Sequence, residues 1–270
     1  KEVHPNGTIA GKSYALDARP YLTFTADQPQ TFKVSTYQYT LDESIQYSLN
    51  GGVWTKLDVG TEITFGGDNG ALRLRGKSSG GTASADYKYA FISFGDSKVK
   101  VTCSGDIRTL VDYDNYVTVS TANARFCYLF KACASLTTAP ELQATILAPS
   151  CYRGMFYECT GLATAPELPA TTLAEHCYNQ MFRGCTGLTV APELPATSLA
   201  ARCYHQMFWD CKKLDHITML ATDISATNCL TQWVNGVAST GTFTKAAAMT
   251  SLTTGVSGIP EGWTVKNYGE

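Results

Sequence analysis

The cysteines of this chain recur at a fixed interval. Cys133, Cys159, Cys185 and Cys211 are each separated by 26 residues, and a second series keeps the same interval. The residues that follow this period are Cys151, Cys177, Cys203 and Cys229; Tyr152, Tyr178 and Tyr204; Met155, Met181 and Met207; Phe156, Phe182 and Phe208; and Leu136, Leu162, Leu188 and Leu214. Such a tandem repeat predicts an array in which each copy buries its apolar side against its neighbours.

About five copies span residues 110–240. The first copy is degenerate but keeps Leu110 and Phe130, and in the last copy Leu230 and Trp233 take the consensus positions of a tyrosine and a methionine. Terminal copies that stay apolar but lose the consensus are expected to act as caps, since they have a neighbour on one side only.

Each copy contains a stretch whose pattern predicts a helix. In residues 173–185 (LAEHCYNQMFRGC), apolar side chains at Leu173, Cys177, Met181 and Cys185 follow the i, i+4, i+8 stripe of an amphipathic helix. The extended part of each copy should be short. Pro140, Pro166 and Pro192 recur at one position and lack an N–H group, so any parallel ladder must be interrupted there.

The blocks MF-x-x-C-x-x-L at residues 155–162, 181–188 and 207–214 resemble the BspA-like leucine-rich repeats of bacterial surface proteins. Residues 241–245 (GTFTK) and 258–265 (GIPEGWTV) look like the closing segment of such proteins. The resemblance implies a leucine-rich-repeat solenoid in a cell-surface or secreted protein that adheres to other macromolecules. Ala191, Pro192 and Glu193 depart from the family pattern, which continues with aliphatic residues into a strand.

Residues 13–109 lack the 26-residue period. They contain seven or eight short β-prone runs, several alternating in polarity, and the turn signals Asn50-Gly51-Gly52 and Asp68-Asn69-Gly70 predict hairpins. The fold expected is therefore α+β with two domains. Residues 1–12 form an N-terminal tail, 13–109 an antiparallel β-sandwich, 110–240 the leucine-rich-repeat solenoid and 241–270 a C-terminal cap.

Composition excludes several classes. Hydrophobic residues make up 44% and charged residues 16% of the chain, which excludes an intrinsically disordered protein. The net charge of -2 does not suit a polycationic nucleic-acid binder. No run of roughly 18 apolar residues indicates a transmembrane segment. A signal segment is absent from this sequence, and a lipid anchor in the precursor stays open.

The cysteines allow three interpretations. Zinc sites pair ligands two to four residues apart, and no C-x-x-C occurs, so no metal is expected. Disulfides between stacked copies would be poorly oriented, because equivalent side chains point in parallel. Burial as small apolar residues fits best, and the states of Cys103 and Cys127 stay open.

Nothing in the sequence indicates catalysis. His176 precedes Cys177, but Cys177 occupies a repeat position and is expected to serve the fold. Neither G-x-S-x-G, H-E-x-x-H nor a phosphate-binding glycine motif occurs. We therefore expect no enzymatic activity, no catalytic residue and no cofactor.

Two sets of residues are candidates for binding. Glu141, Glu167 and Glu193 repeat at one position and should stack about 5 Å apart, either as a solvated row that prevents edge-to-edge association or as a docking strip for basic groups. Trp54 and Tyr47 are candidates for glycan contact, with hairpin packing as the alternative. Tyr152, Tyr178 and Tyr204 are expected to pack in the core.

The function expected is that of a non-enzymatic cell-surface or secreted binding protein. Adhesion to host or neighbouring-cell macromolecules through the repeat surface follows from the family resemblance. The alternative is a surface glycan-binding protein that uses aromatic residues of the sandwich. The partner is expected to be an extracellular protein or glycan and not a nucleic acid.

Overall fold

The computed structural model describes residues 8–9, 12–13, 19–85 and 87–270. Most of the tail predicted at residues 1–12 lies outside these ranges, apart from a short hairpin of two strands, β1 (Thr8–Ile9) and β2 (Lys12–Ser13). The remaining strands are β3 (Leu22–Thr25), β4 (Gln30–Tyr37), β5 (Gln46–Leu49), β6 (Thr55–Lys56), β7 (Ile63–Phe65), β8 (Leu72–Arg75), β9 (Ala83–Ala85), β10 (Lys88–Phe94), β11 (Thr102–Ser104), β12 (His216–Met219), β13 (Thr242–Lys245) and β14 (Thr264–Asn267).

The N-terminal half consists of two antiparallel sheets. One has the strand order β7-β4-β10-β9 and the other β11-β3-β8-β5-β6. Strands β4 and β8 bury alternate side chains, as a sheet with one core-facing side requires. Phe24 of one sheet contacts Phe32 and Phe94 of the other, with ring centroids 5.5 and 5.7 Å apart, so the sheets pack face to face.

One predicted hairpin is present and the other is absent. Strands β5 and β6 pair antiparallel around Asn50 and Gly51, which both have a positive φ. Strands β7 and β8, on either side of Asp68-Asn69-Gly70, belong to different sheets. The 3-10 helix η1 (Gly67–Asn69) carries the chain from one sheet to the other, so this turn does not form a hairpin.

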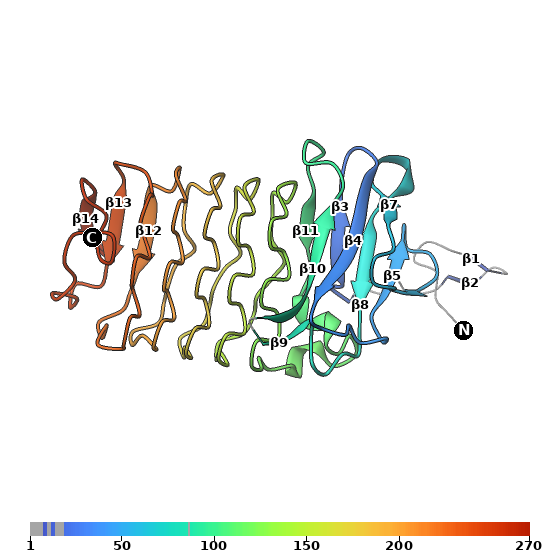
Figure 1. Ribbon diagram of the computed structural model, residues 1–270, viewed down its shortest axis with the longest axis horizontal. Coiled ribbons are helices and arrows are strands. Elements are labelled where there is room, and N and C mark those ends of the chain that lie inside the picture. The colour runs from blue at the N-terminus through green and yellow to red at the C-terminus, as the bar shows by residue number, and fades with distance from the viewer. Residues whose placement is uncertain (1–7, 10–11, 14–18, 86) are drawn as a thin grey trace.

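The repeats form a stack of coils that extends away from the sandwich (Figure 1). Successive copies lie side by side, and the far end of the stack is the parallel sheet β12-β13-β14. Outside that sheet, isolated parallel bridges join neighbouring copies, such as Thr138 with Thr164 and Ile146 with Thr172.

The predicted α+β class with a leucine-rich-repeat solenoid is wrong. The helical segments among the described residues are η1, η2 (Ile107–Leu110) and η3 (Tyr116–Thr118), all short 3-10 turns that lie before the repeats or at their start. Residues 173–185, predicted to be helical, form consecutive turns. The described chain is therefore almost entirely strand, turn and irregular coil.

The hydrogen bonds explain why these residues do not form a helix. The N–H groups of Asn179 and Met181 donate to carbonyls three residues earlier, at 3.2 and 3.1 Å, and not to those four residues earlier as in an α-helix. The N–H groups that alternate with these point to the next copy: those of Tyr178 and Gln180 donate to the carbonyls of Cys203 and His205. Half of the donors in this segment thus join one copy to the next.

Every fourth residue of the segment has a positive φ. In one copy these residues are His176, Gln180 and Gly184, with φ of 58, 58 and 75°. Left-handed backbone costs roughly 1–2 kcal/mol for a residue with a side chain. Its recurrence gives the buried side chains a period of four, which a short stretch of sequence cannot distinguish from the 3.6-residue period of a helix.

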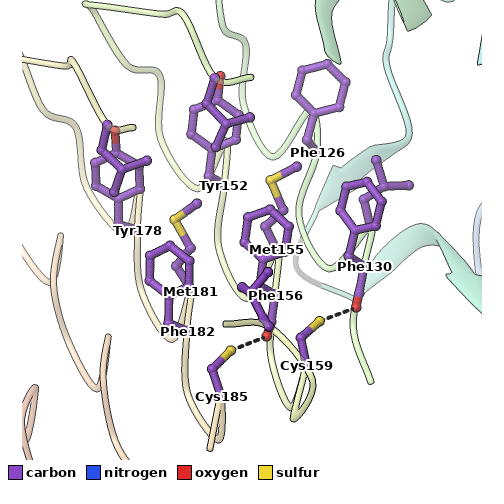
Figure 2. Close-up of a cluster of buried hydrophobic side chains, with 14 of the residues drawn as sticks. Phe126, Phe130, Tyr152, Met155, Phe156, Cys159, Tyr178, Met181, Phe182 and Cys185 are labelled. Carbon is purple, nitrogen blue, oxygen red and sulfur yellow. Dashed lines mark hydrogen bonds between the residues drawn. The ribbon is translucent and has the colours of Figure 1, made fainter. Parts of the chain in front are cut away.

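Identical side chains stack in columns through the core (Figure 2). Phe130, Phe156, Phe182 and Phe208 lie 5.4–5.7 Å apart with nearly parallel rings. Tyr152, Tyr178 and Tyr204 form a second column, buried as predicted. These contacts stabilise each copy only when its neighbours are in place.

The cysteines also pack in the core. No disulfide joins any of the ten cysteines, all of which lie in the described part of the chain. The thiols of Cys159 and Cys185 donate to the carbonyls of Phe130 and Phe156 in the preceding copy, at 2.9 and 3.1 Å (Figure 2). Burial raises the pKa of the Cys159 thiol to about 12, so it stays protonated and able to donate.

One hydrophobic cluster of the described residues extends from the sandwich into the repeats, beside a small second cluster around Tyr89 and Cys127. Phe24 of the sandwich lies 6.3 Å from Phe130 of the first copy, and Phe130 continues into the phenylalanine column. The predicted division at residue 109 stays a prediction. In the described part of the chain, we find no helix that is long and apolar enough to span a membrane.

Candidate functional site

Two grooves open on the repeat stack where the prolines interrupt the hydrogen bonding between copies. Among the described residues, no backbone hydrogen bond joins the segments 139–144, 165–170 and 191–196 to one another. Bridges resume on either side of this gap, at Thr138 with Thr164 and at Ile146 with Thr172. The interruption follows from Pro140, Pro166 and Pro192, which have no N–H to donate, and it confirms the effect predicted for these prolines.

The next copy shows the complementary case. There Thr218 occupies the proline position, and its carbonyl accepts from the N–H of Leu194 at 3.0 Å. Leu194 in turn accepts from Leu220 at 3.0 Å and forms a parallel bridge with Met219. The groove therefore ends where the proline is replaced.

The glutamate row lines both grooves. The larger groove, of about 510 Å³, lies between the segments 165–169 and 192–195 and includes Glu167 and Glu193. The smaller groove, of about 250 Å³, includes Glu141 and Glu167. The other lining residues are proline, leucine and alanine, with Gln143 in the smaller groove, and all three glutamates are exposed. Each groove therefore combines mainly apolar walls with two carboxylates.

The three glutamates differ in their own contacts. Glu141 accepts a hydrogen bond from the Gln143 amide at 3.3 Å. Glu193 interacts with the hydroxyl of Tyr268 near the C-terminus, and this carboxylate raises the pKa of Tyr268. Within the described structure, Glu167 has neither a hydrogen bond nor an ion pair. Glu167, which belongs to both grooves, is thus the carboxylate most available to a partner.

Trp54 and Tyr47 lie elsewhere, on the sandwich. The guanidinium of Arg75 lies 4.2 Å from the centroid of the Trp54 ring, and Tyr21 contacts Trp54 edge-on at 4.9 Å. Tyr47 is half-buried against the core, in register with Thr55 of β6. The structure does not place either residue in the grooves, and Trp54 already has a cation over its ring.

A column of alternating cations and aromatic rings follows another side of the stack. Lys131, Tyr157, Arg183 and Trp209 occupy one repeat position. The cations lie 5.9, 5.6 and 4.5 Å from the centroids of the neighbouring rings. The sequence reasoning did not identify this column. Its rings pack against the protein's own cations, so it stabilises the stack and offers a glycan less ring surface.

The Cys/His pair considered from the sequence is not arranged for catalysis. Cys177 is fully buried, and burial raises the pKa of its thiol far above the usual range, so no thiolate forms near neutral pH. Nδ1 of His176 contacts the Asn179 amide at 2.8 Å. Among the residues that the structure describes, no three His, Cys, Asp or Glu side chains gather as metal ligands would.

Some residues of the larger groove were not identified as candidates from the sequence. Pro169 and Pro195 line it together with the recurring prolines, and Tyr268 reaches Glu193 from the C-terminal segment. The proline-rich motif APELP, repeated at residues 165–169 and 191–195, was the available signal. No sequence period could have placed Tyr268, because it lies outside the repeats.

Comparison of the chain with protein-family models, curated proteins and solved structures finds no match. The resemblance to BspA-like surface proteins therefore has no support beyond the motifs of the sequence.

Proposed function

We propose that the protein is a non-enzymatic cell-surface or secreted binding protein that contacts an extracellular protein through the two grooves of the repeat stack. The observation that carries this proposal is the pair of proline-walled grooves lined by Glu141, Glu167 and Glu193. Apolar walls suit the aliphatic stems of lysine and arginine, and the carboxylates suit their charged ends.

Two adjacent grooves can bind one partner more tightly than a single groove can. An exposed charge pair contributes roughly 0.2–1 kcal/mol, so a single contact is weak. Two adjacent grooves let one extended basic segment make several such contacts at once, and linked contacts add their effects. Adhesion to host or neighbouring-cell proteins would use this multivalency.

The alternative of glycan binding through Trp54 and Tyr47 has less support. Arg75 covers Trp54 at 4.2 Å and Tyr47 packs against the core, which leaves less aromatic surface for a sugar.

The test compares two variants of the full chain with the same charge change. In one, Glu141, Glu167 and Glu193 are replaced by glutamine. In the other, Glu43, Glu62 and Glu158 are replaced by glutamine; these are exposed and lie outside the grooves.

Binding of an oligolysine peptide and of a panel of basic extracellular-matrix proteins is measured at low and high salt. We expect the groove variant to lose about tenfold in affinity at low salt, since three contacts of ~0.5 kcal/mol add to one factor of ten. The control variant should retain most of its binding. Equal losses in the two variants would show that net charge, and not the grooves, determines binding.

A further inference from the structure

A cluster of histidine, asparagine and arginine side chains lies on the turn side of three adjacent copies. We define the histidine cluster as Arg153, His176, Asn179, Arg202 and His205. Arg153, Asn179 and His205 occupy one repeat position, and His176 and Arg202 another. The backbone joins them across copies, because His176 N–H donates to the Ala201 carbonyl at 3.0 Å and the His205 carbonyl accepts from Gln180 at 2.9 Å.

The asparagine and one imidazole of this cluster each hold a buried polar atom with no hydrogen-bond partner among the described residues. These atoms are Oδ1 of Asn179 and Nδ1 of His205. Asn179 is only 3% exposed, and its Nδ2 contacts Nδ1 of His176 at 2.8 Å. Most buried polar atoms in proteins are paired, so an unpaired imidazole nitrogen marks a place where a change of protonation has consequences.

The charges around the two imidazoles are mainly positive. His176 faces Arg153, Arg202 and His205, and also the carboxylate of Glu175, which lies 3.6 Å from His176 Nε2 and 3.6 Å from Arg202 Nη1.

His205 faces Arg202, Arg153 and Arg183. The residues at the equivalent positions of the following copy, Asn228 and Thr231, are uncharged. The Glu175 carboxylate is shared between His176 and Arg202.

We propose that the histidine cluster is an acid-sensitive element of the repeat stack. Protonation of His176 and His205 adds two positive charges among Arg153, Arg183 and Arg202, in a partly buried site that also holds Glu175. The resulting repulsion weakens the contacts between the copies at residues 150–158, 176–184 and 202–210. Acidification therefore loosens the middle of the stack before its ends.

The direction of the pH effect follows from the environment. Burial and the neighbouring arginines lower the pKa of both His176 and His205 below the ordinary value of 6.5. Between the unfolded pKa and the lower folded pKa, the unfolded chain binds more protons than the folded one. Above pH 6.5, where both histidines are neutral, they contribute their full share to the stability of the fold. That share is lost as the pH falls below 6.5.

The test measures urea unfolding of the full chain at about pH 7.5 and about pH 5, either side of an ordinary histidine pKa. The H176N/H205N double variant removes both imidazoles. Asparagine tolerates the positive φ of 58° at position 176, so the variant should fold. The matched control is H216N, which removes an exposed histidine outside the cluster.

We expect the urea midpoint of the wild type and of H216N to be lower at the acidic pH than at about pH 7.5, and the double variant to lose at least half of this difference. An NMR titration of the histidine Cε1 protons should show two resonances with pKa below about 6.5 that disappear in the H176N and H205N single variants. An equal fall of the midpoint in wild type and double variant, or titration of both histidines at or above that value, would overturn the proposal.

Discussion

In the N-terminal half, backbone hydrogen bonds join antiparallel strands, whereas in the turn segments of the repeats half of the backbone donors join one copy to the next, about one period along the chain. Strand β4 pairs with β10 and β7, whose sequences are unrelated. In the stack, Tyr152 pairs with Cys177 and Tyr178 with Cys203. A residue of the stack is therefore always beside its own equivalents.

This difference explains where the candidate site lies. In a sandwich, one side chain can differ from all its neighbours. In the stack, the residue type at one repeat position returns in the next copy, about 4.8 Å away. A buried phenylalanine therefore becomes a column, and an exposed glutamate becomes a row. A row of prolines, likewise, interrupts the hydrogen bonds over several copies and opens the grooves.

The largest effect is expected from the aromatic columns. Phe182 is fully buried between Phe156 and Phe208, each 5.7 Å away. Phe182→Ala should lower the free energy of unfolding by about 3–5 kcal/mol, and Phe32→Ala in the sandwich by a similar amount. Because one core links both halves through Phe24 and Phe130, urea denaturation should show a single transition for each variant. Two transitions, of which Phe182→Ala shifts only one, would separate the halves.

A smaller effect is expected where a glycine makes room for a neighbouring copy. A Cβ at Gly154 would lie 2.1 Å from Cε1 of Tyr128, and its φ is 56°. Gly154→Ala should cost about 2–4 kcal/mol from strain and overpacking together. Gly60 in the sandwich half also has a positive φ but no atom within 4 Å of such a Cβ. Gly60→Ala should therefore cost only about 1 kcal/mol. The measurement is the fall in melting temperature of each variant. An equal fall for Gly154→Ala and Gly60→Ala would contradict the close approach between copies.

The smallest effect concerns exposed charge. Glu167 shares one groove with Glu141 and the other with Glu193. Because like charges repel, Glu167→Gln should raise stability by a few tenths of a kcal/mol at low salt, with less effect at high salt. Glu62 instead pairs with Lys33 at 3.3 Å, and Glu62→Gln should lower stability slightly. The change in the free energy of unfolding is measured by urea denaturation at low salt. Opposite signs for the two variants would confirm that the glutamates of the row repel one another, and the same sign for both would contradict that repulsion.

Sequence patterns predicted the parts of the fold that depend on local chemistry. Asn50 and Gly51 adopt the positive φ expected of a hairpin turn, and Pro166 interrupts the pairing of copies. The 26-residue period correctly identified side chains that stack in columns, such as Phe156, Phe182 and Phe208.

The helix prediction failed for a physical reason. Cys177, Met181 and Cys185 are spaced by four, and over so short a stretch this spacing fits both a helix and a series of four-residue turns. The decision rests on hydrogen bonds between copies, which supply partners for N–H groups that a helix would satisfy within itself. Such pairing cannot be read from one copy. The contact of Tyr268 with Glu193 was not predictable either, because Tyr268 lies outside the repeats.

The most direct test of this account is an NMR measurement of backbone chemical shifts for residues 173–185 in the full chain. If the copies consist of turns joined to one another, the Cα and carbonyl shifts should alternate, with left-handed values at His176, Gln180 and Gly184. An unbroken run of helical shifts from residue 173 to 185 would contradict the stacked turns.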